Sequence, residues 1–125
     1  GYWSRGLGDV YKRQVFVMPK ENSDMNYLMS VFSDFNKKEF STQTIEVSSL
    51  MMGLDQHILI IKTYMDYKGS LNYELKALAD KGVMKEMLKL NFEKILISKD
   101  NFSDFYKDKD LQGYKDFYNK NYPAI

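Results

Sequence analysis

Short apolar runs alternate with polar segments along the chain and predict four β-strands. Residues 15–19 (VFVMP) and 92–98 (FEKILIS) are short, apolar and bounded by polar residues, which is typical of buried strands. Residues 44–52 and 56–65 are two further strand-like runs, and the Gly-Leu-Asp connection between them indicates a hairpin. Because residues 58–61 are apolar on both faces, we expect an interior strand that helices cover.

Two segments between these strands carry apolar residues at helical spacing. Ser23 or Asp24 is placed to cap the first helix. Its apolar stripe, which we interpret as core rather than as a ligand groove, comprises Met25, Leu28, Met29, Phe32 and Phe35. The stripe of the second helix comprises Leu71, Leu75, Leu78 and Ala79. We expect Gly82 to end that helix and residues 83–91 to add a short helical piece.

The order β-α-β-β-α-β predicts a ferredoxin-like α+β fold, in which two helices pack on one face of an antiparallel sheet. Right-handed crossovers would place the first and third strands side by side in the middle of that sheet. With 125 residues, the chain is long enough for one domain with one core.

An aromatic tail follows the last strand, between Lys99 and Tyr122. Its rings recur at i, i+3 and i+4 in two clusters, which predicts two short helices that meet near residues 111–113. We expect this C-terminal helical tail to fold back over an open part of the sheet. Because large rings at a surface favour protein contacts, the candidate partner-contact residues are Phe102, Phe105, Tyr106, Tyr114, Phe117, Tyr118 and Tyr122.

The composition of residues 1–14 differs from that of the rest of the chain. They hold the only tryptophan, Trp3, and the only arginines, Arg5 and Arg13. Back-translated, residues 4–14 resemble a transposon-end sequencing-library adapter read through in one frame. We therefore expect residues 1–14 to be a non-native tail and residues 15–125 to be the module itself, as a C-terminal fragment of a larger protein. Without the charged residues of that tail, the net charge changes from +1 to −1.

Composition also excludes several classes of function. The chain has no cysteine, which excludes disulfide scaffolds, thiol catalysis and cysteine metal sites. The near-neutral charge argues against a nucleic-acid partner, and so does the balance of five lysines and five aspartates between Lys99 and Tyr122. No apolar run approaches the length needed to cross a bilayer, so we expect no direct membrane insertion of this fragment.

The tail contains a pattern that partly matches a calcium-binding loop. Asp108, Asp110, Gln112 and Gly113 occupy positions 1, 3, 5 and 6 of an EF-hand-like loop. Position 12, which should be a bidentate acid, is Asn119. We therefore interpret this segment as a solvated turn between two helices and predict no metal site.

Two further residues are candidates for catalysis. His57 is the only histidine and could act as a base with Asp55 or Glu46, but we interpret it as a surface residue at a strand end. Ferredoxin-like folds include acylphosphatases, whose chemistry needs a cationic cradle after the first strand. The polar loop there offers only Lys20. The sequence thus predicts no catalytic residue and no cofactor.

Residues 15–122 resemble the C-terminal module of tetratricopeptide-repeat lipoproteins of the PorW/SprE kind. The resemblance rests on VFVMP, on FSDFNKKEFS before IEVSSLMMGLDQHILIIKTYMD, and above all on FEKILISKDNFSDFYKDKDLQGYKDFYNKNY. It implies a non-catalytic role in the type IX secretion and gliding machinery of Bacteroidetes, in the periplasm at the outer membrane. The implied partners are other cell-envelope or secretion-machinery proteins.

Two alternatives stay open beside this interaction or scaffolding module. Exposed tyrosine and phenylalanine rings stack on sugars, so one alternative is a glycan-binding module that recognises peptidoglycan. The other is a small enzyme of the acylphosphatase type, which the residues favour least.

Overall fold

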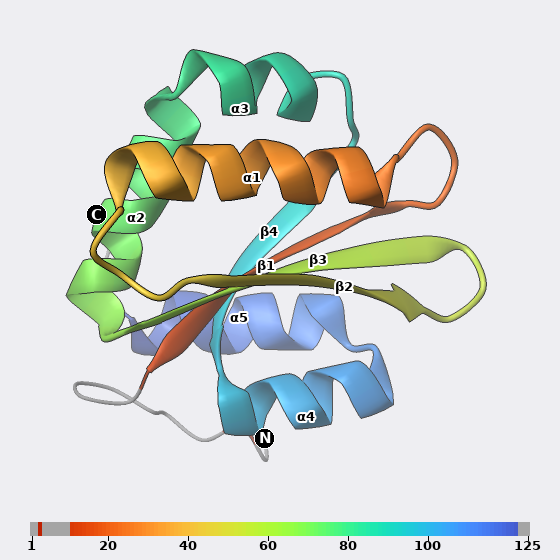
Figure 1. The fold of residues 1–125 in the computed structure, drawn as a ribbon. Helices are drawn as coiled ribbons and strands as arrows, with labels where there is room; N and C mark the ends of the chain where they lie inside the picture. Colours follow the sequence, from red (N-terminus) through yellow and green to blue (C-terminus); the bar gives the residue numbers. More distant parts are fainter. Residues whose placement is uncertain (1–2, 4–10, 123–125) are drawn as a thin grey trace.

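The computed structural model describes Trp3 and residues 11–122, which form three layers (Figure 1). Three helices lie over one face of a four-stranded sheet, and two helices lie over the other. In chain order the elements are β1 Lys12–Pro19, α1 Met25–Glu39, β2 Glu46–Met52, β3 Gln56–Met65, α2 Tyr67–Ala79, α3 Lys81–Met87, β4 Glu93–Ser98, α4 Lys99–Asp108 and α5 Leu111–Asn121.

The strand order is β2-β3-β1-β4, and every neighbouring pair is antiparallel. The first and third strands therefore lie in the middle, which confirms the predicted ferredoxin-like α+β arrangement. In the register, Val17 lies opposite Ile58 on β3 and Glu93 on β4. The predicted β2–β3 hairpin also forms, and Gly53 takes the positive φ of 66° that its tight turn requires.

The first face of the sheet packs against α1 as its pattern predicts. Phe16 and Leu59 from the strands meet Phe32 and Phe35 of the helix in one buried cluster. Asp24 is the residue that caps α1, because its carboxylate accepts the N–H of Tyr27 at 3.1 Å.

The stripe predicted for the second helix is wrong. Leu75 is 56% exposed, and the residues that α2 buries are Ser70, Tyr73 and Ala77. The spacing of the leucines does not reveal this face, because two of its three residues carry hydroxyl groups. A buried hydroxyl group needs a hydrogen-bond partner. Ser70 has that partner in Thr63, with 3.3 Å between the two hydroxyl oxygens.

Gly82 does not end the second helix. The helix α2 ends at Ala79, and Gly82 lies inside α3. The break falls at Asp80, whose carboxylate accepts the N–H of Val83 at 2.9 Å and so starts a new helix. Asp80 also pairs with Lys38 and thereby ties α3 to α1.

Asp80→Ala is expected to lower the free energy of unfolding by about 1 kcal/mol, because alanine cannot cap α3. Asp80→Asn keeps the cap and loses only the charge. The hydrogen bond from Lys38, and after it the N–H of Val83, lower the pKa of Asp80. The contribution of the charge is therefore present above the pKa of the unfolded chain and is lost as pH falls through the lower folded value. Urea denaturation near pH 7 and near pH 2.5 measures the free energy of unfolding of both proteins. The difference between the wild type and Asp80→Asn should be smaller at pH 2.5 than at pH 7.

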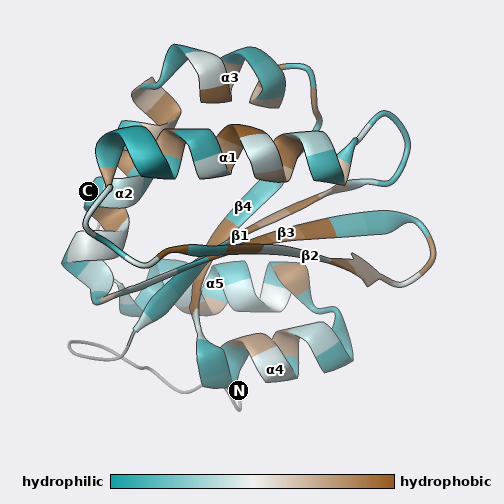
Figure 2. Cartoon of the chain, viewed as in Figure 1, coloured by the Kyte–Doolittle hydropathy of each residue, from teal (hydrophilic) through white to brown (hydrophobic). Residues whose placement is uncertain are grey.

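The second face is covered by the C-terminal tail, as predicted. Seven apolar strand residues form a buried cluster with the rings of Phe102, Phe105 and Tyr114 from α4 and α5. The hydroxyl of Tyr114 donates to the carbonyl of Leu96 at 2.6 Å, which fixes α5 against β4. The strand centres form the hydrophobic middle of the protein, between helices that are polar on their outer sides (Figure 2).

The folded unit begins before the expected boundary at Val15. Strand β1 starts at Lys12, because its ladder to β3 and β4 continues through residues 12–14. Gln14 is buried, and its amide nitrogen donates to the carbonyl of Ser70 at 2.9 Å. Residues 4–10 of the expected adapter segment lie outside the described residues, and the origin of residues 1–14 stays a prediction.

Candidate binding site at the edge strand

Four of the seven candidate contact rings belong to the core. Phe105 and Tyr114 are 0% exposed, Tyr122 is 6% exposed and Phe102 is 8% exposed. In the described structure these four rings pack inside the protein rather than form a partner surface. Tyr106, Phe117 and Tyr118 are the accessible members of the set, and contact of a partner with them stays a prediction.

The tyrosines at the end of the tail form a stacked group. The rings of Tyr118 and Tyr122 lie parallel with 4.6 Å between their centroids, and Tyr67 approaches the hydroxyl of Tyr118 at 3.4 Å. Burial raises the pKa of Tyr122 to about 12 and raises that of Tyr118 further. These hydroxyls therefore stay protonated at neutral pH, and the group holds the tail in place.

His57 on β3 contacts Ser23 in the loop after β1. The Ser23 hydroxyl lies 2.8 Å from Nδ1 of His57 and 2.9 Å from the carbonyl of Pro19. The same hydroxyl lies 3.0 Å from the carbonyl of Lys20, so two carbonyls compete with Nδ1 for its single proton, and the direction of the Ser23–His57 bond depends on the His57 tautomer. Glu46, one suggested partner of His57, accepts instead from the hydroxyl of Tyr64. The pair therefore fastens the loop after β1 to β3, and Lys20 in that loop is exposed.

The calcium-like segment of the tail is a helix start. Asp110 caps α5 by accepting the N–H of Gly113 at 2.9 Å. A side chain at position 113 would come within 2.0 Å of that carboxylate, which explains the glycine. Among the described residues, no cluster of three or more His, Cys, Asp or Glu side chains is placed to hold a metal ion. None of the described helices is long and apolar enough to cross a membrane.

The two edges of the sheet differ in their protection. Edge strands expose unpaired backbone groups, and proteins usually block them with charges, proline, bulges or a covering element. Strand β4 has such protection: Lys94 pairs with Glu74, and Glu93 pairs with Lys115. Strand β2 (EVSSLMM) has no lysine and no proline, and its only charge is Glu46 at its start. Within the described residues β2 pairs only with β3, so its outer edge is open.

The backbone groups on that open edge can be assigned. In an antiparallel pair, residues alternate between those that bond to the partner strand and those that point away from it. The Met51 carbonyl accepts from the hydroxyl of Tyr106 in α4 at 2.8 Å, so the backbone N–H and C=O of Met51 face away from β3. By the same alternation, the backbone N–H and C=O groups of Val47 and Ser49 also face away from β3. Their N–H and C=O groups form the open part of the edge.

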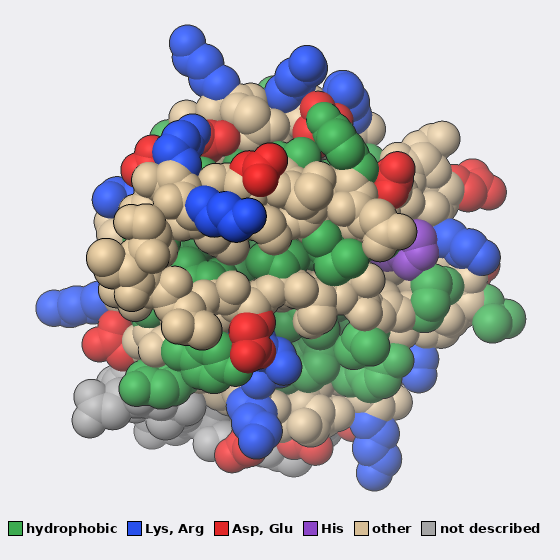
Figure 3. All heavy atoms as spheres, viewed as in Figure 1, with side chains coloured by type: hydrophobic (Ala, Val, Ile, Leu, Met, Phe, Trp, Pro, Cys, Tyr) green, Lys and Arg blue, Asp and Glu red, His purple; other side chains and the backbone are tan. Residues whose placement is uncertain are grey.

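Helix α1 lies alongside this edge (Figure 1), and hydrophobic side chains gather between the helix and the strand (Figure 3). Met25 and Met29 of α1 and Val47 of β2 are partly buried apolar residues that pack against the core here. Together, α1 and the outer edge of β2 form what we call the α1–β2 groove. It offers both open backbone groups and apolar contact area.

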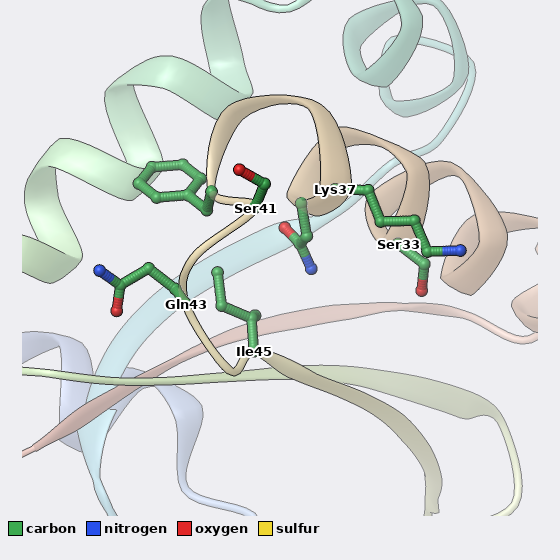
Figure 4. A pocket seen from close by; sticks show the side chains of 7 residues that line it. Ser33, Lys37, Ser41, Gln43 and Ile45 are labelled. Atoms are coloured by element: carbon green, nitrogen blue, oxygen red, sulfur yellow. The ribbon is translucent and has the colours of Figure 1, made fainter.

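A pocket lies at each end of the α1–β2 groove. The first pocket, of about 250 Å³, lies where the loop after α1 enters β2 (Figure 4); its lining includes Ser33, Asn36, Lys37, Ser41, Gln43 and Ile45. The second, of about 350 Å³, lies where α1 begins and β2 ends; its lining includes Ser23, Asp24, Ser49, Leu50 and His57. The groove thus has a lysine at one end and an aspartate at the other.

The arrangement of an open strand, a flanking helix and two terminal pockets is a site suited to an extended ligand. The chain matches no protein-family model, and comparison with curated proteins and with solved structures finds no match either.

Proposed function

We propose that the chain is a non-catalytic interaction module that binds an extended segment of a partner protein as a fifth strand on β2. The observation that carries this proposal is the open edge at Val47 and Ser49, in a strand without the protection that β4 has. A polypeptide strand is the ligand whose spacing of donors and acceptors matches such an edge.

The dimensions of the α1–β2 groove support a peptide rather than a smaller ligand. Seven residues of β2 extend over about 23 Å, and the two pockets lie at the two ends of that length. A bound strand would point alternate side chains into the apolar strip beside Met29 and Val47. Peptidoglycan binding gains less support, because four of the seven rings that could stack on sugars are buried.

The biological setting of the proposal comes from the sequence. The resemblance to PorW/SprE-type lipoproteins leads us to propose a scaffolding role in the periplasm, at the outer membrane, with a component of the type IX secretion machinery as the partner. The partner segment would be unpaired or extended before it binds. Strand addition would then order it.

A proline on the edge tests the proposal. Peptides about ten residues long, displayed with free carboxyl ends, are selected on the wild-type protein and measured by fluorescence anisotropy. Ser49→Pro removes an outward N–H and is expected to weaken binding at least about tenfold. Ser49→Ala, which keeps the N–H, is expected to bind as the wild type does.

Amide hydrogen exchange provides a second readout that needs no variant. In the free protein the amides of Val47 and Ser49 should exchange faster than those of Ser48 and Leu50, and the bound peptide should protect them. Peptides that bind Ser49→Pro unchanged and leave these amides unprotected would overturn the proposal. A dimer of the wild type that Ser49→Pro abolishes would also overturn it, because a second copy of the chain would then occupy the edge.

A further inference from the structure

The pocket at the start of β2 contains a buried amide that is only half satisfied. Asn36 is 8% exposed, and its Oδ1 accepts from the hydroxyl of Tyr73. Its Nδ2 has no hydrogen-bond partner among the described residues. A buried donor without a partner costs about 1–3 kcal/mol, so such groups are uncommon in native proteins.

The orientation of this amide follows from Tyr73. Burial raises the pKa of Tyr73 well above its ordinary value, so the hydroxyl keeps its proton and donates it. Only the oxygen of the Asn36 side chain can accept that proton. The amide nitrogen of Asn36 is therefore the atom without a hydrogen-bond partner among the described residues. Asn36 lines the pocket.

The other polar side chains of the pocket can also donate hydrogen bonds. Ser33 and Lys37 come from α1, and Ser41 and Gln43 come from the loop that follows it (Figure 4). Lys37 forms no ion pair with any described residue, whereas Lys38 next to it pairs with Asp80. Among the described residues that line the pocket, none is acidic. A donor-rich pocket with one cation suits an anionic acceptor, above all a carboxylate.

We infer that this pocket binds the terminal carboxylate of the extended segment that occupies the α1–β2 groove. The inference rests on the proposed function, because it assigns the chemistry of one end of that ligand. Ile45, which lines the pocket, directly precedes the first residue of β2. A segment whose carboxyl end enters there runs antiparallel to β2, as every strand pair of this sheet does.

The ligand class is thus the carboxyl terminus of a partner protein, with apolar side chains at alternate positions. Its preceding residues lie toward the second pocket, where Asp24 favours a basic residue over an acidic one. An acidic side chain within a longer segment offers the same carboxylate chemistry. The test therefore includes peptides of both kinds.

Selected peptides are compared as the free acid, as the C-terminal amide, and with two residues added beyond the carboxyl end. The free acid is expected to bind at least about tenfold more tightly than the amide or the extended peptide. Lys37→Gln is expected to weaken the free acid about fivefold and to leave the amide unchanged. Lys38→Gln, the matched control on the same turn, should change neither.

A second variant tests the amide itself. Asn36→Asp keeps an acceptor for Tyr73 and replaces the donor with an oxygen that repels a carboxylate. Asn36→Asp should weaken binding of the free acid more than binding of the amide, and thermal melting reports whether the variant folds. If Asn36→Asp does not fold, Lys37→Gln still tests the inference.

The outcomes separate this inference from the proposed function. Equal binding of acid and amide peptides, with binding still lost in Ser49→Pro, would overturn the carboxylate site and leave strand addition intact. Preference for the extended peptide would assign the pocket to an internal acidic side chain and overturn the terminal one. Binding that depends on the carboxylate and on Lys37, but is indifferent to Ser49→Pro, would overturn strand addition alone.

Discussion

A chain that ends at Ser98 is expected to lose cooperative folding. Without α4 and α5, one face of the sheet exposes the apolar side chains of Val15, Val17, Ile58, Ile60, Ile95 and Ile97. Each side chain of this size contributes roughly 1.5–3 kcal/mol when it is fully buried. Six of them together match or exceed the ~5–15 kcal/mol that stabilises an ordinary domain. The two helices of the tail are thus as much a part of the fold as the β-α-β-β-α-β unit.

The measurement is a thermal melt followed by circular dichroism, together with size-exclusion chromatography. We expect residues 1–98 to aggregate or to melt without a sharp transition, because an apolar sheet face is exposed. The control is a chain that ends at Tyr122, which keeps every element and should melt as the full chain does. A sharp transition of the shorter chain within a few degrees of the full one would contradict the prediction.

The layers of helices and sheet could be predicted, because the pattern of apolar residues along a strand shows which of its faces are buried. Residues 58–61 are apolar on both faces, which a sheet with helices on one side cannot satisfy. The aromatic spacing of the tail supplied the missing cover, and the structure places both helices there. Prediction failed at α2, where the buried face depends on hydroxyl pairs such as Ser70 with Thr63. Such pairs are tertiary contacts that no local pattern records.

The predicted module boundary at Val15 and the start of β1 at Lys12 rest on different properties of the chain. The composition of residues 1–14 is the basis for predicting a non-native origin of that segment. The length of a strand depends instead on how far its backbone can pair with neighbouring strands. Lys12 and Gln14 meet β3 and β4 through main-chain bonds that are indifferent to the side chains. The boundary at Val15 therefore marks a change in composition, while the sheet begins at Lys12.

The candidate site was only partly visible in the sequence. The predicted strand order already put the second strand at an edge, and the charges of Glu93 and Lys94 on the other edge were visible too. Their partners, Glu74 and Lys115, are distant in sequence, so the contrast between the two edges needed the structure. Aromatic rings drew attention to the tail instead, although the size of a ring does not distinguish core from surface.

One residue of the site is marked by the sequence pattern of α1. Asn36 lies four residues after Phe32 and one after Phe35, within the apolar stripe of α1. A polar residue in a core stripe requires a partner, and that requirement links Asn36 to Tyr73 and to the pocket.

Phe105→Ala is expected to lower the free energy of unfolding by about 3–5 kcal/mol. The ring is 0% exposed and packs beside Phe102, with 6.1 Å between the two centroids. Its removal leaves a cavity between α4 and the sheet that the neighbouring side chains fill only in part. Guanidinium denaturation measures the loss, and an unchanged slope would show that the rest of the fold is intact.

Tyr106→Phe is the matched control, because the next ring along α4 is 37% exposed and the substitution removes only its hydroxyl. It should cost about 1 kcal/mol, the contribution of one hydrogen bond to Met51. A loss below about 1 kcal/mol for Phe105→Ala would place that ring at the surface. The tail would then be an aromatic contact face rather than the second wall of the core, and the truncated chain would no longer be expected to unfold.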